Sequence, residues 1–194
     1  MRARSELLPR VDEANERAIF GGSQADHALI QLGRGDLREF HGDALESLDT
    51  IYHQLRYRTY RMYGYITDDM SIDHGREYDS HDALSTHLLV VKRSAALGTR
   101  AIGCMRLILR DHGTPLPVEE FFPEVFADGP APFCSTEVSR LISFDSQGYE
   151  NDRVVMELFG HALKVSDAWY EPELLETAYG VIDPEYIRKL SSLG

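Results

Sequence analysis

Two apolar stretches in the middle of the chain, THLLVVK at residues 86–92 and AIGCMRLIL at residues 101–109, decide the fold. Both are partly β-branched, and the segment that separates them contains Gly98, so they predict a β-hairpin. STEVSRLISF at residues 135–144 predicts a third strand. The prolines between the second and third strands predict an irregular crossing with one short helix at residues 118–126.

Helical patterns flank this central region on both sides. From residue 43 to Met62 apolar side chains recur mostly at steps of three or four, and Gly64 stands where a helix C-cap belongs. A second long amphipathic helix is predicted at residues 152–169, and Pro184 opens a last helix. The other predicted elements are short: strands at residues 27–32 and 176–182, and a polar loop at residues 66–82.

The order of these elements indicates the fold class and the domain organisation. Residues 1–24 are charged and weakly periodic, which is typical of a loosely attached arm or of a single helix. Residues 25–194 are predicted to form one domain. Four or more strands interleaved with helices predict an α/β (α+β) fold, in which a mixed twisted sheet is flanked by helices.

Composition excludes several classes of protein. With 43% hydrophobic and 27% charged residues, the 194-residue chain is expected to be globular rather than disordered. Its 20 basic and 32 acidic residues give a net charge of −12, which argues against nonspecific nucleic-acid binding. No apolar run approaches the ~20 residues of a membrane span. Two cysteines, interpreted as buried and inert, offer no disulfide framework and fit a cytoplasmic location.

Charged residues gather at two places around the first long helix. Arg56 and Tyr60 are one turn apart beside its apolar stripe, so they either point towards the sheet or pack on the helix surface. EYDSHD at residues 77–82 holds three carboxylates, which require a cation, a metal ion or exposure to water. Their spacing matches no common metal site, so no metal ligands are predicted.

Two of the predicted strands also carry charge. Arg106 is a lone arginine in an apolar strand, and the acidic run at residues 77–82 is its obvious partner; the alternative is the solvent face of an edge strand. In the next strand, alternation places Glu137 and Ser139 on one face, and Val138 and Arg140 on the other.

Four motifs occur in a fixed order: LRYRTY at residues 55–60, EYDSHDALS at 77–85, GCMRLI at 103–108 and TEVSRLIS at 136–143. Together they resemble the long-chain N-acyl amino acid synthases and the related acyl-homoserine-lactone autoinducer synthases, both similar to the GNAT-type N-acyltransferase fold. The resemblance implies that Glu137, Ser139 and Arg140 are catalytic. It also implies a set of substrate-binding residues, namely Arg56, Tyr60, Asp79, Asp82, Arg106 and either or both of Phe121 and Phe122.

Departures from the motifs favour the N-acyl amino acid synthases. Tyr63-Gly64-Tyr65 stands where autoinducer synthases usually carry a tryptophan, and PLPVEEFFPEVF at residues 115–126 looks more like the former group. SQGYEND at residues 146–152 replaces the glycine-rich pyrophosphate loop of coenzyme A enzymes and adds two acids. Acyl carrier protein is therefore the expected donor. Candidate residues for a basic docking face are Arg58, Arg61, Arg153, Lys164, Arg188 and Lys189.

The resemblance implies transfer of a long-chain fatty acyl group from the 4′-phosphopantetheine of acyl carrier protein to the α-amine of an amino acid, with tyrosine as a candidate. We expect Glu137, or a water that it holds, to take the proton of the amine, and Arg56 or Arg106 to hold the substrate carboxylate. The chemistry requires no metal or redox cofactor. Two alternatives stay open: an autoinducer synthase that uses S-adenosylmethionine, and a non-catalytic module that binds acyl carriers.

Overall fold

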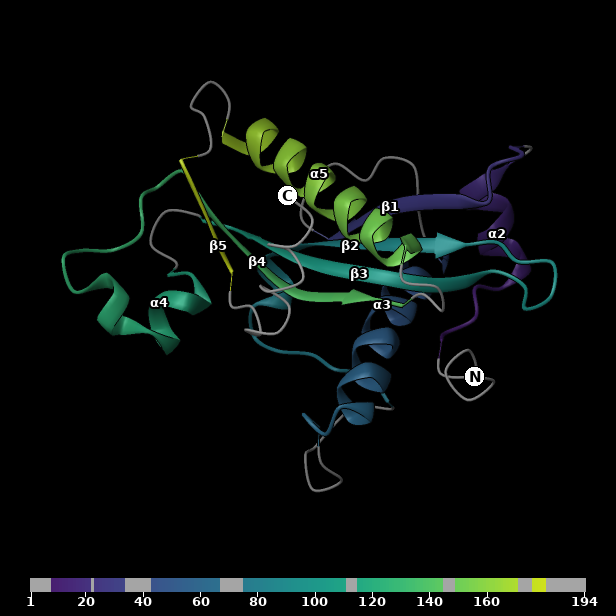
Figure 1. The fold of residues 1–194 in the computed structure, drawn as a ribbon, viewed down its shortest axis with the longest axis horizontal. Coiled ribbons are helices and arrows are strands. Elements are labelled where there is room, and N and C mark those ends of the chain that lie inside the picture. Colours follow the sequence, from purple (N-terminus) through teal and green to yellow (C-terminus); the bar gives the residue numbers. More distant parts are fainter. Residues whose placement is uncertain are drawn as a thin grey trace.

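In the residues that the structure describes, five strands form one mixed sheet with helices on both of its faces (Figure 1). This is seen in a computed structural model, which describes residues 8–21, 23–33, 43–66, 75–110, 115–144, 149–170 and 176–180. The strands follow the chain order across the sheet: β1 His27–Gly33, β2 Ser85–Lys92, β3 Arg100–Leu109, β4 Ser135–Ser143 and β5 Thr177–Gly180. Neighbours from β1 to β4 are antiparallel, whereas β5 runs parallel to β4.

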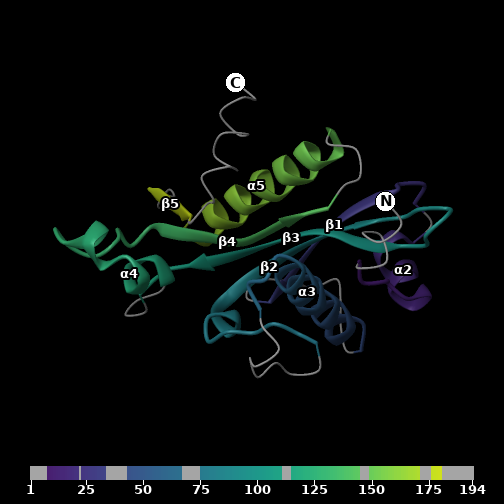
Figure 2. The ribbon, with the colours of Figure 1, turned by 60° about the horizontal axis from the view of Figure 1, so that its bottom comes forward.

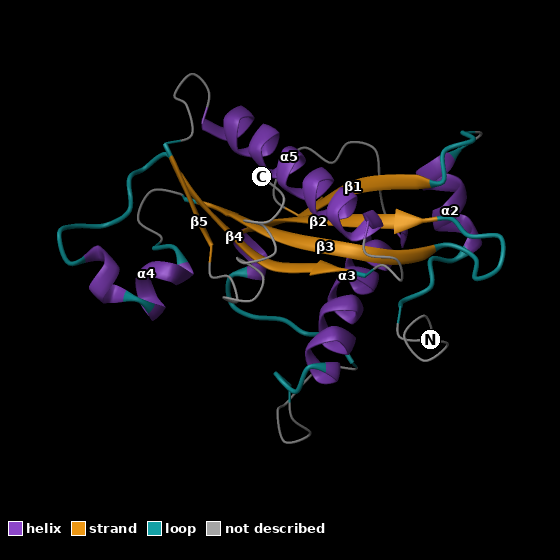
Figure 3. Cartoon of the chain, in the orientation of Figure 1, coloured by secondary structure: helices purple, strands orange, loops and turns teal. Residues whose placement is uncertain are grey.

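Two long helices cover opposite faces of this sheet. Helix α3, Asp43–Met62, lies on one face and helix α5, Tyr149–Tyr170, lies on the other (Figure 2). Helix α2, Glu13–Phe20, and the short α4, Pro117–Phe121, lie at opposite ends of the sheet (Figure 3). The short 3-10 helices η1, Asp82–Leu84, and η2, Pro123–Phe126, precede β2 and follow α4. No helix in the described ranges is both long and apolar enough to cross a membrane.

Alternation of side chains along β2 and β3 produces two separate cores. On the α3 side, Leu48 and Leu55 pack with Leu89 and Cys104; on the α5 side, Leu158 packs within a second cluster of apolar residues. The members of that second cluster that come from the strands are Leu88, Val90, Ile102, Met105, Leu107 and Leu109. Since both faces are covered, β2 and β3 are buried on both sides, which explains why their sequences are almost continuously apolar.

Glycine at position 103 sets how closely α5 approaches the sheet. A Cβ atom there would lie 2.5 Å from Cγ1 of Val154 on α5 and 3.1 Å from the carbonyl oxygen of Ile142. The first distance is far below van der Waals contact, so a side chain at position 103 requires α5 to shift.

A β-bulge interrupts the pairing of β3 with β4. Arg106 is opposite Ser139 and Cys104 is opposite Ile142, so β4 has one residue more than β3 between these pairs. Arg140 lies in the bulge with φ 57°, the one positive φ among the described non-glycine residues. Its guanidinium therefore lies on the α3 face, beside Asp79. The prediction that Arg140 faces away from Glu137 and Ser139 is wrong, because strict alternation does not continue through a bulge.

Most predicted elements are confirmed, with ends that shift by a few residues. The N-terminal stretch contains a helix, α2, and Phe20 and Val11 of this stretch are buried in the α3-side core. The predicted crossing helix is two short helices, because Phe122 separates α4 from η2 and Pro123 opens the second. The helix expected after Pro184 lies outside the described residues.

Candidate functional site

Three arginines and three carboxylates meet on the α3 face of the sheet, and we call this group the charged cluster. They come from five different parts of the chain: α3, the segment before η1, η1 itself, β3 and β4. The members of the charged cluster are Arg56, Glu77, Asp79, Asp82, Arg106 and Arg140. Five of these six residues belong to the site that the sequence predicts, and the tertiary structure brings them into direct contact.

Arg56 and Arg106 form the buried half of the charged cluster. The Arg56 guanidinium donates to Asp82 Oδ1 over 2.5 Å and also pairs with the Glu77 carboxylate. Arg106 Nη1 lies 2.6 Å from both carboxylate oxygens of Asp79, and its Nε donates to Ser139 Oγ over 3.0 Å. The predicted pairing of Arg106 with the acidic run is thus confirmed. The edge-strand alternative is wrong, because β3 lies between β2 and β4.

Arg140 is the accessible member of the charged cluster. Its side chain is 30% exposed, whereas those of Arg56 and Arg106 are buried. Nη2 of Arg140 lies 2.7 Å from Asp79 Oδ2, and its guanidinium carbon lies 5.5 Å from the centroid of the Tyr60 ring. The Nε atom of Arg140 is buried and has no hydrogen-bond acceptor within the described part of the chain. The exposed part of its guanidinium is what a ligand can reach, whereas Arg56 and Arg106 are buried and paired.

Electrostatics hold two carboxylates of the cluster, Asp79 and Asp82, in their charged form. Burial by itself would raise the pKa of Asp79, but the hydrogen bond and the charge of Arg106 outweigh it and lower that pKa. For Asp82, burial is likewise outweighed by His87 and Arg56, and its pKa lies well below the usual range. The cluster is therefore costly to disrupt, because each of these two buried charges depends on its partners.

Glu137 differs from these carboxylates. It is buried on β4, two residues before Ser139 and on the same face, and its Oε2 accepts a hydrogen bond of 2.7 Å from the backbone N–H of Val118. Burial raises its pKa, and neither the Val118 hydrogen bond nor the nearby Arg106 fully compensates. A carboxylate with a raised pKa is a stronger base than an ordinary one once it is ionised.

The described pairing between β4 and β5 ends just before the bulge. Residues Ser135 to Val138 of β4 are opposite Thr177 to Gly180 of β5, and Arg140 is two residues further along β4. Glu137 and Arg140 are three residues apart on β4, so a buried carboxyl with a raised pKa lies close along the strand to a partly exposed cation.

Several predicted residues lie apart from the cluster or outside the described residues. Phe121 is 71% exposed on α4 and Phe122 follows it; no ring contact or polar contact of the described residues joins either to the cluster. Of the candidate basic face, Arg153 pairs with Glu157 over 3.0 Å on α5. Arg188, Lys189 and residues 146–148 of the predicted donor loop lie outside the described residues.

Sequence reasoning missed functional candidates next to those it found. Glu77 stands in the quoted acidic run but was not predicted as a site residue; it contacts both Arg56 and Arg140. His87, whose Nε2 lies 3.4 Å from Asp82 Oδ1, was also missed. Its signal was a polar residue in an apolar strand, the same signal that drew attention to Arg106. Cys104 is buried as predicted, and burial raises the pKa of its thiol to about 12.

Comparisons with known proteins agree with this fold. The model of the Acetyltransferase (GNAT) domain family matches residues 55–158, more than half of the chain. No curated protein matches the sequence.

Solved structures with a similar fold include TofI in a ternary complex with an inhibitor and MTA (20% identity, TM-score 0.55, 88% of this chain and 79% of that chain). The AHL synthase LasI is 20% identical with a TM-score of 0.61, over 87% of this chain and 78% of that chain. BjaI, a CoA-dependent acyl-homoserine lactone synthase solved with SAM and isopentyl-CoA, is 15% identical with a TM-score of 0.59, over 86% of this chain and 71% of that chain. They confirm the predicted fold class and, at the level of the fold, the predicted relation to acyl-homoserine-lactone synthases.

Proposed function

The chain belongs to the acetyltransferase (GNAT) domain family, a family of acyltransferases, and we propose that it transfers a fatty acyl group from the thioester of acyl carrier protein to the α-amine of an amino acid. The observation that carries the proposal is Arg140, whose side chain is 30% exposed at the edge of a cluster of otherwise buried charges. An amino acid carries an α-carboxylate beside its amine, and a guanidinium is the group that binds a carboxylate best.

The reaction requires few groups. The neutral amine attacks the thioester carbon, a C–N bond forms, the C–S bond breaks, and the thiol of the carrier leaves with a proton. Glu137, or a water bound to it, accepts the proton of the amine, for which its raised pKa is suited. Backbone N–H groups of β4 next to the bulge stabilise the oxyanion, because a bulge leaves strand N–H groups without partners in the ladder.

The remaining residues of the site have positioning roles in this proposal. Arg56 and Arg106 hold Glu77, Asp79 and Asp82 in place, and Glu77 and Asp79 in turn orient Arg140. Ser139 supports Arg106 through its hydroxyl. Tyr60 packs against the Arg140 guanidinium and limits its movement. We place no role on Phe121 or Phe122 beyond lining an acyl chain, for which their apolar, exposed rings are suited.

A second candidate is an acyl-homoserine-lactone synthase that uses S-adenosylmethionine, which the fold of LasI and BjaI favours. S-adenosylmethionine also carries an α-amine and an α-carboxylate, so Arg140 and Glu137 would have the same roles. The sequence at residues 63–65, with tyrosines in place of the tryptophan usual in those synthases, favours the amino acid substrate. The third alternative, a non-catalytic module, makes no use of the raised pKa of Glu137.

Mass spectrometry distinguishes the three. The purified chain is incubated with acyl carrier protein charged with a long acyl group, and with either a mixture of amino acids or S-adenosylmethionine. N-acyl amino acids support the proposal, acyl-homoserine lactones support the second candidate, and unchanged acyl carrier protein in both reactions contradicts both. The Arg140→Gln variant should raise the KM for the amino acid at least ~10-fold. Arg17→Gln, an exposed arginine on α2, is the matched control and should leave it unchanged.

A further inference from the structure

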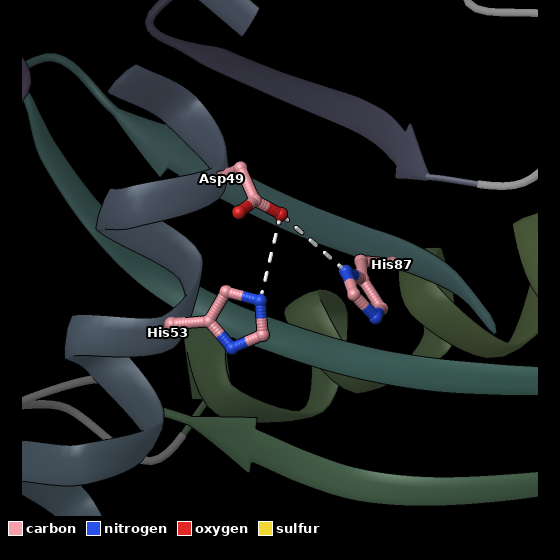
Figure 4. Close-up of side chains that lie close together, drawn as sticks. All are labelled: Asp49, His53 and His87. Carbon is pink, nitrogen blue, oxygen red and sulfur yellow. Dashed lines mark ion pairs between the residues drawn. The ribbon is translucent and has the colours of Figure 1, made fainter. Parts of the chain in front are cut away.

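We propose that Asp49, His53 and His87 form a binding site for a divalent transition-metal ion of the zinc type (Figure 4). Asp49 and His53 lie one turn apart on α3, and His87 lies on the strand β2 that faces this helix. The site lies beside the charged cluster, on the same face of the sheet, and no step of the proposed acyl transfer uses it. Its ligands come from two elements, so a bound ion would fasten α3 to the sheet.

The ligand atoms are spaced as a zinc ion requires. His53 Nε2 lies 3.5 Å and His87 Nδ1 lies 3.8 Å from Asp49 Oδ1, and all three ligand atoms lie within 4.8 Å of one another. Ligands at zinc distances of roughly 2.0–2.2 Å in tetrahedral geometry stand about 3.3 Å apart. The three atoms therefore need to close by about 1.5 Å at most, and the imidazole nitrogens already face the carboxylate (Figure 4).

Both histidines have their second nitrogen directed at an acceptor, as metal ligands usually do. His53 Nδ1 lies 2.8 Å from the carbonyl oxygen of Glu77, which can only accept, so Nδ1 carries the hydrogen and Nε2 keeps its lone pair. His87 Nε2 lies 3.4 Å from Asp82 Oδ1, which leaves Nδ1 as the nitrogen that faces Asp49. In both residues the ring nitrogen on the side away from that second partner faces Asp49.

The independent observation is that His87 is buried without a hydrogen bond. It is 3% exposed, and neither of its ring nitrogens makes a hydrogen bond of normal geometry with any described residue. A buried polar group without a partner is costly and is rare in stable structures. Its ring is nevertheless held in place, because Tyr52 stacks on it with centroids 4.3 Å apart and an interplanar angle of 6°. Asp49 Oδ1, at 3.8 Å, is too far from Nδ1 for a hydrogen bond, and a metal ion between them would bind both atoms.

The types of the three ligand side chains, and the exposure of Asp49 to solvent, determine which ion can bind. Two imidazoles and one carboxylate suit zinc, whereas calcium and magnesium prefer oxygen ligands throughout. The Asp49 side chain is 40% exposed, so an ion can enter from solvent and complete its coordination with water. The two carboxylates that touch the histidines, Asp49 and Asp82, provide negative charge against the nearby Arg56.

The test is a titration of the chelator-treated full chain with Zn²⁺. We expect one ion per chain, a Tm that rises by several degrees at saturation and returns on addition of chelator, and, with Co²⁺, the visible absorption of a tetrahedral nitrogen- and oxygen-ligated ion. His53→Gln and His87→Gln should each weaken Zn²⁺ binding at least ~10-fold. His161→Gln, a histidine on α5 that contacts Gln31, is the matched control and should bind as the wild type does.

Two results would overturn the proposal. One is the absence of stoichiometric Zn²⁺ binding by the wild-type chain, which would leave the three residues as an ion-paired group only. The other is Zn²⁺ binding that survives both His53→Gln and His87→Gln, which would place the ion elsewhere on the chain. Far-UV circular dichroism of each variant confirms that it is folded, and Asp49→Asn, at a partly exposed position, gives a third variant that is less disruptive to the core.

Discussion

The two faces of the sheet are built from the same strands but differ in character. On the α5 face, β2 and β3 present leucine, valine and methionine, and Leu158 and Val154 of α5 pack against them. On the α3 face, the same strands present Leu89 and Cys104 to an apolar core but also His87 and Arg106, and β4 adds Glu137. Burying charges is costly, so a protein that needed only stability would have two wholly apolar faces. Both faces thus stabilise the fold, and the charged groups that the proposed function uses lie on the α3 face.

The largest expected effect is a loss of stability when Arg56 on the α3 face is replaced. Replacing it in Arg56→Met keeps the side-chain length but leaves the buried carboxylates of Glu77 and Asp82 without their main partner. We expect the free energy of unfolding to fall by about 3–5 kcal/mol, measured by urea denaturation. Arg153→Met, which breaks an exposed pair on α5, is the control and should cost less than ~0.5 kcal/mol. Equal, small effects of both variants would mean that the charged cluster contributes little to stability.

Glu137→Gln tests the function of the α3 face rather than its stability. The amide keeps an oxygen that can accept from the Val118 N–H but is not a base. We expect kcat to fall by about 10²–10³ with little change in KM, and the acidic limb of the pH profile to disappear. Glu157→Gln on α5 is the control. A fall of less than ~10-fold with an intact pH profile would assign the proton to water or to a backbone carbonyl.

Gly103→Ala tests the α5 face. The added Cβ would meet Val154 at 2.5 Å, and a β-branched side chain in a packed core cannot easily turn away. We expect a loss of about 1–3 kcal/mol in the free energy of unfolding, with KM for the amino acid unchanged in the folded enzyme. Gly160→Ala, a position with open space around it on α5, should cost nothing. A large change in KM after Gly103→Ala would show that the two faces are not separable.

The choice of donor is expected to have a smaller effect. If the site takes its acyl group from acyl carrier protein, kcat/KM should exceed that for acyl-CoA of the same chain length by at least ~10-fold, or about 1.4 kcal/mol. The expectation rests on the two acids in SQGYEND at residues 146–152, which oppose a pyrophosphate. Steady-state kinetics with both donors measure the ratio. Equal rates would contradict the carrier-protein proposal and would place this chain with the CoA-dependent enzymes.

The smallest expected effects concern how stability changes with pH. Two carboxyls on the α3 face contribute to this change with opposite signs. The pKa of Asp79 is lowered in the folded state, so its contribution to stability is complete above the ordinary pKa of about 3.8 and is lost as the pH falls through the folded value. The pKa of Glu137 is raised, so its ionisation reduces stability above the folded pKa and has no effect below about 4.5.

Chemical denaturation between pH 3 and 8 measures both effects. Asp79→Asn should reduce the loss of stability below about pH 4, and Glu137→Gln should gain stability relative to the wild type as the pH rises above about 4.5. If the free energy of unfolding changed with pH in the same way in both variants, the two carboxyls would share one environment.

Sequence reasoning predicted the site best where a residue was out of place in its pattern. Arg106 was found because a lone arginine in an apolar strand needs a partner, and Asp79 proved to be that partner. His87 is likewise a polar residue in an apolar strand, but it was counted as part of the apolar run at residues 86–92 and not as a site residue. The prediction placed Arg140 on the wrong face because a bulge adds only one residue to a strand. This bulge holds an arginine and no glycine, so the sequence gives no sign of it.

The sequence by itself determined the elements, their order and most of the charged residues, because hydrophobic periodicity and turn residues act over a few neighbouring positions. Only the tertiary structure decided which of these residues meet. The contact of Arg56 with Asp82 and Glu77 spans more than twenty positions, and that of Arg140 with Asp79 spans 61. These contacts depend on the bulge in β4, on the path of the segment before η1 and on the packing of α3. These are products of many weak contacts across the whole chain, and no local pattern records them.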